Sequence, residues 1–222
     1  MGDVGWVNFF RAFRDCTNLT AFNVGTADTS SVTTMQEMFL NCTSLTTLDV
    51  SNFDTSSNTN MAAMFYSCSS LTALDLSSFD TSSVTNMYLM FNGCSNLTSL
   101  DVSNFDTSSV TNISRMFLNC FNLTNLDIKH FDISSVTDGT SFLQNANKAL
   151  TTTQYDELLE AWAVQDVQPN VPWHFGDAQY TVETIADWYS PRSASSLSII
   201  NNKLVSIADS TAVFGAGQQV IT

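Results

Sequence analysis

Charged residues are scarce in this chain, and very few of them are basic. Asp, Glu, Lys and Arg make up 13% of the 222 residues, and 7 basic residues stand against 21 acidic ones, which gives a formal net charge of −14. Binding to a nucleic-acid backbone requires Lys and Arg to neutralise phosphates. Nucleic acid is therefore not an expected partner, and an anionic membrane surface is disfavoured for the same reason.

Long apolar runs are also absent. No segment approaches the roughly 18 apolar residues that a membrane-spanning helix needs. The first six residues, MGDVGW, contain no basic segment, and no apolar core follows them. We therefore expect neither membrane insertion nor a signal peptide in this chain, and no lipid-attachment cysteine lies near its start.

The residues on which catalysis usually depends are sparse. There are two histidines and no CxxC motif. His130 occupies a position that other parts of the sequence fill with Asn or Ser, and His174 has Asp177 and Glu183 nearby but no nucleophile or metal-ligand spacing. We expect a protein that is not an enzyme and has no cofactor.

A repeat of 26 residues dominates what is present. The five cysteines are each 26 residues apart, with a phenylalanine three residues before each and a leucine three residues after. The cysteines are Cys16, Cys42, Cys68, Cys94 and Cys120. Such a period indicates a stack of similar coils, each covering the apolar face of its neighbour.

The third unit shows how each coil is expected to fold. Met61, Met64, Phe65 and Cys68 have the spacing of one face of a short helix. Leu74-Asp75-Leu76 alternates between apolar and polar residues as a short strand does. A Ser- and Thr-rich turn follows, in which Phe79 and Val84 are expected to point inward. The predicted fold class is α/β: a leucine-rich-repeat solenoid with a parallel β-sheet face and short helices, plus a small α+β C-terminal cap.

The domain prediction is a solenoid over residues 1–146, with five coils and degenerate ends, and a capping region over 147–222. In the C-terminal region, Thr152 or Thr153 is expected to be the N-cap of a helix through Leu158, Leu159 and Trp162. A second helix is expected around Ile185 and Trp188. A β-hairpin is expected over 197–207.

The cysteine column has three possible roles. Disulfides would require Cβ atoms closer than parallel coils place them, and five cysteines cannot all pair. A row of metal sites would require closely spaced Cys and His ligands, and the sequence does not contain such a spacing. Buried free thiols that act as small core residues are the favoured interpretation.

Two columns of aspartates run along the repeat. One column, Asp49, Asp75, Asp101 and Asp127, is expected on the outward strand face; the other is Asp28, Asp54, Asp80, Asp106 and Asp132. Hydrogen bonding to turn amides and hydroxyls is the favoured role. Calcium binding by the first column is the alternative.

The outward strand face is the predicted ligand face. Beside the first aspartate column it carries Thr47, Ser99, Asn125, Ser51, Ser77 and Ser103. This face is small, polar and acidic, which suits a glycan or a protein with a basic patch. The alternative is a solvated face that binds no ligand.

The repeat resembles the BspA-like leucine-rich-repeat surface proteins, and most closely their long-repeat branch. The residues that carry the likeness are Phe39-x-x-Cys42-x-x-Leu45-x-x-Leu48-Asp49-Val50 and the following Phe53-Asp54-Thr55-Ser56-Ser57, and it covers roughly residues 6 to 146. That family includes cell-surface adhesins, lipoproteins and virion or phage-tail proteins. The resemblance implies a recognition or attachment protein at a bacterial cell or virion surface, with a protein or glycan receptor. The alternative is a structural virion component, such as a phage fibre, tail or decoration protein, that packs against neighbouring subunits.

Overall fold

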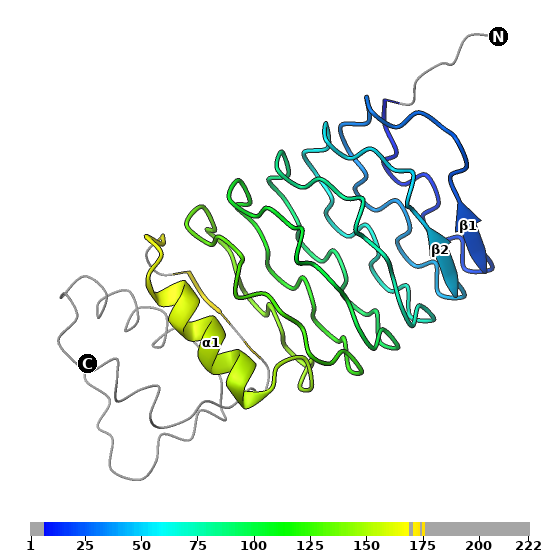
Figure 1. Ribbon diagram of the computed structural model, residues 1–222. Coiled ribbons are helices and arrows are strands. Elements are labelled where there is room, and N and C mark those ends of the chain that lie inside the picture. Colours follow the sequence, from blue (N-terminus) through cyan, green and yellow to red (C-terminus); the bar gives the residue numbers. More distant parts are fainter. Residues whose placement is uncertain (1–6, 169–170, 174, 176–222) are drawn as a thin grey trace, which may run out of the picture.

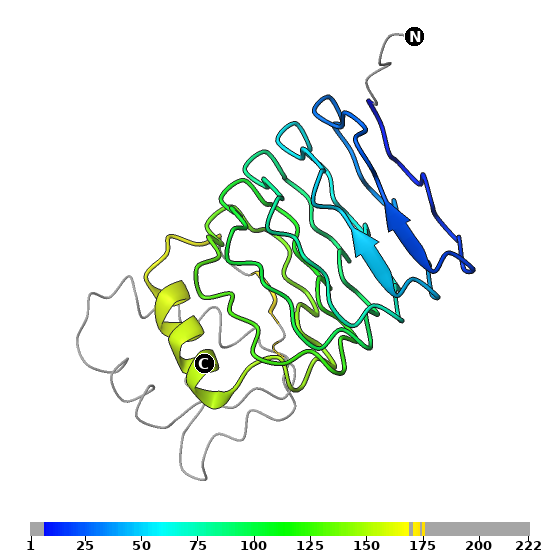
Figure 2. The same cartoon turned by 45° about the vertical axis from the view of Figure 1, so that its right-hand side comes forward.

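The computed structural model describes residues 7–168, 171–173 and 175. Over most of this range the backbone winds into similar units that follow the 26-residue repeat of the sequence and lie side by side in a regular row (Figure 1). We call each such unit a coil. The turned view shows the same row, with equivalent segments of successive coils running parallel (Figure 2).

The sheet is much smaller than predicted. Strands β1 (Ala21–Asn23) and β2 (Thr47–Asp49) pair in parallel, with Phe22 opposite Leu48. Later coils keep the in-out-in burial at Leu74, Asp75 and Leu76 but are not assigned as strands. There, coil-to-coil bonding is reduced to contacts such as Thr98 N to Thr72 O at 3.1 Å. The described part of the chain is thus mixed, with a two-stranded parallel sheet and one α-helix.

The short helices predicted within the coils are wrong. The segment around Met61 to Cys68 is a series of turns, in which Met64 N bonds to Met61 O and Cys68 N to Phe65 O. The N–H groups that alternate with these donors bond instead to the next coil, as Ala63 N does to Tyr88 O at 2.7 Å. A helix would need all of these donors for its own ladder. Ala63 also has a φ of 54°, which right-handed helix excludes.

The inward residues were nevertheless predicted correctly, because these turns bury the same side chains as a helical face would. Met61, Met64, Phe65 and Cys68 are fully buried, and so are their equivalents in the neighbouring coils. The phenylalanine rings stack along the row, with centroids 5.6 Å apart between Phe65 and Phe91 and again between Phe91 and Phe117. The core is therefore one continuous column of repeated side chains.

The C-terminal side of the row is covered by helix α1 (Thr152–Ala163), as Figure 1 shows. Its N-cap is Thr151, one residue before the predicted cap, and Gln154 completes a capping box. Tyr155, Leu158 and Trp162 are its buried residues. The helix predicted at the start of the cap is thus confirmed.

Polar side chains after α1 take the place of a further coil. Gln165 accepts from Ile133 N at 2.7 Å and donates to Phe131 O at 2.9 Å. Trp173 forms a parallel bridge with Gly139, where a Cβ atom on the glycine would lie 2.7 Å from the indole.

The predicted second helix and the β-hairpin lie outside the described residues. Within the described residues, no helix is long and apolar enough to cross a membrane.

Candidate ligand-binding face

The aspartates of the strand face cap their own turns. Each accepts a hydrogen bond from the backbone N–H two residues further on. Asp75 accepts from Ser77 N at 2.9 Å and Asp101 from Ser103 N at 2.9 Å. Asp49 accepts from both the N–H and the hydroxyl of Ser51, at 3.1 and 2.7 Å. The last member, Asp127, accepts from Lys129 N at 3.3 Å.

Hydrogen bonds from serines favour the ionised form of three of the strand-face carboxylates. The bonds from Ser51, Ser77 and Ser103 lower the pKa of Asp49, Asp75 and Asp101 respectively. The carboxylate of Asp75 opposes this shift at Asp49, since like charges repel. Turn hydrogen bonds therefore stabilise the negative charge of these three carboxylates.

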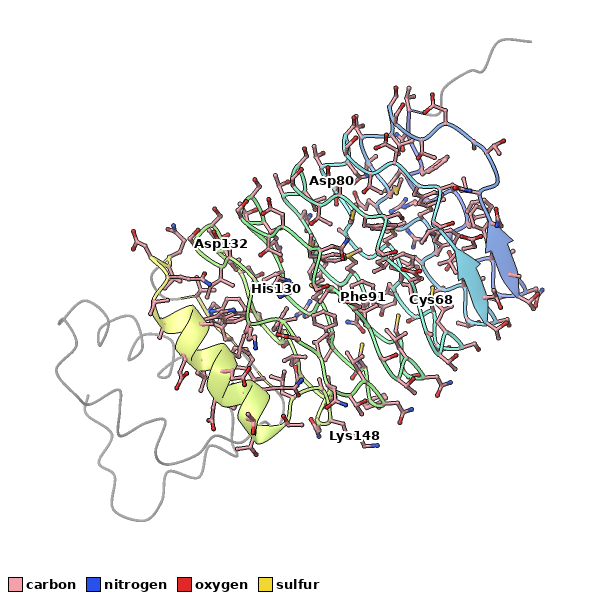
Figure 3. All side chains as sticks on the ribbon, viewed as in Figure 1. Cys68, Asp80, Phe91, His130, Asp132 and Lys148 are labelled. Atoms are coloured by element: carbon pink, nitrogen blue, oxygen red, sulfur yellow. The ribbon has the colours of Figure 1, made fainter. Side chains whose placement is uncertain are left out.

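The second aspartate column has the same chemistry with an added hydroxyl. Asp80 accepts from Ser82 N at 2.9 Å and from Ser82 Oγ at 2.6 Å. Equivalent pairs of bonds join Asp28 to Ser30, Asp54 to Ser56, Asp106 to Ser108 and Asp132 to Ser134. The predicted turn role of this column is what the structure shows. Figure 3 labels Asp80 and Asp132, which lie along one margin of the row.

The geometry of a metal site is not assembled in the part of the chain that the structure describes. No three His, Cys, Asp or Glu side chains gather closely enough there to hold an ion. Calcium typically takes 6–8 oxygen ligands, whereas each aspartate here faces its own turn. Calcium binding at Asp49, Asp75, Asp101 and Asp127 remains a prediction for experiment.

The other predicted face residues differ in how far they are engaged. Ser51, Ser77 and Ser103 are exposed, and each donates its backbone N–H to the aspartate two residues earlier. The side chains of Thr47, Ser99 and Asn125 are exposed and make no hydrogen bond within the described structure. With Ala73, these three form one column, which we call the open column. Its residue type changes from coil to coil, unlike that of the aspartates beside it.

A buried threonine column was missed by the sequence analysis. Thr29, Thr55, Thr81 and Thr107 are each 1% exposed. The Thr55 hydroxyl donates to Asp80 O and accepts from Asp80 N, both at 2.8 Å. The signal was present, since every copy of Asp-Thr-Ser-Ser repeats this threonine, but turn composition alone does not tell which side chain points inward.

A second missed column consists of Asn60, Asn86 and Asn112, which pair in parallel from coil to coil. Each side-chain oxygen accepts from the backbone N–H two residues later, as in Asn86 Oδ1 with Tyr88 N at 3.0 Å. Thr34 and Asp138 occupy the two ends of this column. These residues bond to the backbone at the start of each turn series, so their role is structural.

The cysteines are free and mostly buried. Cys42, Cys68, Cys94 and Cys120 are inside the row, and Cys16 in the first described coil is half-buried. The thiol of each buried cysteine donates to the carbonyl of the phenylalanine 29 residues earlier, at 3.1–3.2 Å. The interpretation of the column as core thiols is confirmed for these four.

His130, one of the two histidines, has a structural contact. Its Nε2 lies 2.9 Å from Val102 O, and its ring meets Phe131 edge-on. His174, Asp177 and Glu183 lie outside the described residues. His130 thus joins two coils at the position where Asn104 bonds to Leu76 O in the coil before.

Comparison with known proteins identifies the family. The model of a family described as "Mycoplasma protein of unknown function, DUF285" matches residues 7–100, 49–155 and 73–188. The chain belongs to this family. The overlapping matches begin at different coils, as expected when a family pattern spans several similar units. No curated protein and no solved structure matches the chain.

Proposed function

We propose that the chain is a leucine-rich-repeat solenoid of the BspA-like type. Three observations support this: the 26-residue period, the hydrogen bonds between equivalent positions of successive coils, and the membership of a repeat-matching family. Its coils have turns where the short helices were predicted. The parallel register of β1 and β2 is the sheet element of the fold.

We further infer a non-enzymatic recognition or attachment protein at a bacterial cell or virion surface. The observation that carries this proposal is the open column, Thr47, Ala73, Ser99 and Asn125. Its side chains have no structural bonds and vary between coils, while the aspartates beside them are committed to turns. Exposed positions that vary between the coils of a regular scaffold are where repeat proteins build binding surfaces, and this column is one such set of positions.

The chemistry of this face favours a glycan or a protein as receptor. Hydroxyl, amide and carboxylate groups on a rigid, regularly spaced surface are suited to sugar hydroxyls and to basic side chains. The net charge of −14 works against nucleic acid and anionic lipid. No bound cofactor is needed for such recognition.

A structural role in a virion is the second candidate, and one feature favours it. In coil after coil, carbonyl groups of the turn series accept from the preceding coil, as Gln36 O does from Arg11 N at 3.1 Å. The equivalent carbonyls of the first described coil, on Phe10, Ala12 and Arg14, receive no hydrogen bond in the structure. An edge with a row of unpaired acceptors is one on which a neighbouring subunit can pack.

Two measurements on the purified chain separate these candidates. Gel filtration with light scattering gives the oligomeric state, and a glycan array tests binding. We expect a monomer that binds a defined glycan set, with binding lost in a Thr47→Ala, Ser99→Ala, Asn125→Ala variant. A Ser57→Ala, Ser83→Ala, Ser109→Ala variant is the matched control, because these serines are also exposed but lie on a different turn. Concentration-dependent self-association without glycan binding would favour the structural role instead.

A further inference from the structure

Two departures from the repeat coincide at one corner of the row. The position directly after each cysteine, or after Ala146 in the last coil, carries a small polar side chain in every coil but one. Its residues are Thr17, Thr43, Ser69, Ser95, Phe121 and Asn147. Phe121 is 51% exposed, so the aromatic ring that replaces a hydroxyl is not used to fill the core.

The second departure is in the next column. Its residues are Asn18, Ser44, Ser70, Asn96, Asn122 and Lys148. Other basic side chains are engaged: Arg11 and Lys129 with carboxylates, and Arg115 with the Tyr88 hydroxyl. Lys148 is exposed and makes no hydrogen bond or ion pair in the described structure. An unpaired cation is conspicuous in a chain with net charge −14.

The register of the last coils brings these two positions together. Asn145 Nδ2 donates to Asn119 Oδ1 at 2.8 Å, so the coils remain aligned just before the corner. The bonds Ala146 N to Leu143 O and Ala149 N to Ala146 O repeat the turns of the coil before. In this register Asn147 is the equivalent of Phe121, and Lys148 of Asn122, just before Ala149 leaves the register and its carbonyl accepts from Leu126 N at 2.8 Å. Figure 3 shows Lys148 at the lower corner of the row.

The last two coils also carry exposed polar side chains that make no structural bonds. Asn147 and Asn125 are exposed, and neither side chain makes a hydrogen bond in the described structure. Asn125 is also the last member of the open column, and it follows Phe121 by four residues in the same coil. Asn122 is different, since its Nδ2 donates to Ser95 O at 2.9 Å and holds the corner in place.

We propose that Phe121, Lys148, Asn125 and Asn147 form a subsite for an acidic sugar, a pyranose that bears a carboxylate. The inference rests on the proposed recognition function and assigns its ligand class. The exposed phenyl ring offers an apolar platform for the C–H face of a sugar ring. The Lys148 ammonium pairs with the carboxylate, and the free amides donate to and accept from hydroxyl groups.

The test uses the whole chain with 3′-sialyllactose and lactose, which differ by the acidic sugar. Binding is followed by saturation-transfer NMR and calorimetry. We expect the wild-type chain to bind sialyllactose at least about tenfold more tightly than lactose. Phe121→Ser should weaken both sugars by about tenfold or more. Lys148→Asn should remove the preference for sialyllactose and its dependence on salt, because it removes only the charge pair.

Both substitutions install residues that the same columns already carry, so folding should be retained, and thermal unfolding of each variant checks this. Val164→Ser is the matched control, because Val164 is 81% exposed but lies beyond α1. Its sugar binding should equal that of the wild-type chain.

The failure of this inference differs from the failure of the proposed function. If neither sugar binds, or if Phe121→Ser binds both as the wild-type chain does, the subsite is overturned. Glycan-array binding that the Phe121→Ser variant retains would then leave the recognition function standing. An array on which the wild-type chain binds nothing would overturn both the subsite and glycan recognition, and would leave a protein as the receptor of the proposed function.

Discussion

The Cys68 thiol donates a hydrogen bond to the carbonyl oxygen of Phe39, with 3.2 Å between Sγ and O, and so ties its coil to the coil before. The same bond joins Cys94 to Phe65 and Cys120 to Phe91. The cysteine column is therefore a row of neutral donors inside the core. A thiolate there would lose this bond and would be buried as an unpaired charge.

The first prediction concerns alkaline stability. Burial raises the pKa of the Cys42 thiol to about 11 and of Cys120 to about 12. The folded state thus keeps protons that unfolded thiols lose near pH ~8.5. This contribution is complete below that pH and is lost as the pH rises through the folded pKa values, by at most about 1.4 kcal/mol per pH unit for each thiol.

Urea unfolding between pH 7 and pH 11 measures this effect. The free energy of unfolding should fall steadily above pH ~8.5. Cys120→Ala should be less stable at pH 7, because it leaves a cavity, but should show a shallower decline. An equal slope in the variant and the wild-type chain would show that this thiol does not contribute.

The second prediction is that the thiols differ in reactivity. Cys16 is half-buried, whereas the other four are buried and protonated. Since the thiolate is the reacting form, Ellman's reagent at pH 8 should label one thiol in the native chain and five after denaturation. Cys16→Ser should abolish the native signal. Fast labelling of more than one thiol in the native chain would contradict the buried column.

The burial pattern could be predicted from the sequence, whereas the backbone conformation could not. Met61, Met64, Phe65 and Cys68 point inward as their spacing indicates. The same spacing fits a helix and a series of turns whose alternate N–H groups bond to the next coil. Periodicity records only which side chains face the core. The choice between the two depends on bonds to residues 25 positions away, such as Ala63 N to Tyr88 O.

Some features of the candidate site could likewise be predicted from the sequence, and others could not. The turn role of the aspartates followed from Asx chemistry, because the serine two residues later is adjacent in sequence. Phe121 and Lys148 were not identified, since their exposure and lack of partners are properties of the fold. The departures of these two residues from their columns were visible in the sequence, and comparing the columns would have drawn attention to them.

The third prediction tests the buried threonine column. In Thr55→Val the hydroxyl is lost, so Asp80 N–H loses its acceptor and Asp80 O loses its donor. We expect unfolding to be easier by about 1–3 kcal/mol, the cost of a buried polar group without its bond. Thr47→Val is the control, because Thr47 is exposed, and its effect should stay within about 0.5 kcal/mol. Equal effects of the two changes would contradict a structural role for the Thr55 hydroxyl.

The fourth prediction concerns the turn position that Ser67 and Gly93 share in successive coils. Their φ angles are 56° and 75°, a region that costs a residue with a Cβ atom about 1–2 kcal/mol. Gly93→Ala should therefore be destabilising, and its Cβ would also lie 3.1 Å from Ser67 Oγ. Ser67→Gly should be stabilising by about 0.5–1 kcal/mol, because relief of strain exceeds the added entropy of the unfolded chain.

Urea unfolding of both variants and of the double variant checks this pair. Without the Ser67 side chain, Gly93→Ala should cost less than it does alone, since the contact with Ser67 Oγ has gone. Additive effects would mean that this contact contributes nothing and that the φ angle alone sets the cost.

The fifth prediction is that removing calcium leaves stability unchanged. Turn amides and hydroxyls already bond to the strand-face carboxylates, as Ser51 does to Asp49 at 3.1 and 2.7 Å. Calorimetry should give the same melting temperature in about 1 mM EDTA and in about 1 mM CaCl₂. These concentrations are of the order that empties and fills weak calcium sites. An Asp75→Asn, Asp101→Asn variant keeps the turn acceptors and relieves the repulsion between neighbouring carboxylates. It should melt at or slightly below the wild-type temperature, and equally in both buffers, because the turn bonds that lower the pKa of Asp75 and Asp101 favour a carboxylate over a neutral amide and no metal ion is expected to stabilise the row. A melting temperature several degrees lower in EDTA for the wild-type chain, and not for this variant, would instead place calcium on the aspartate column.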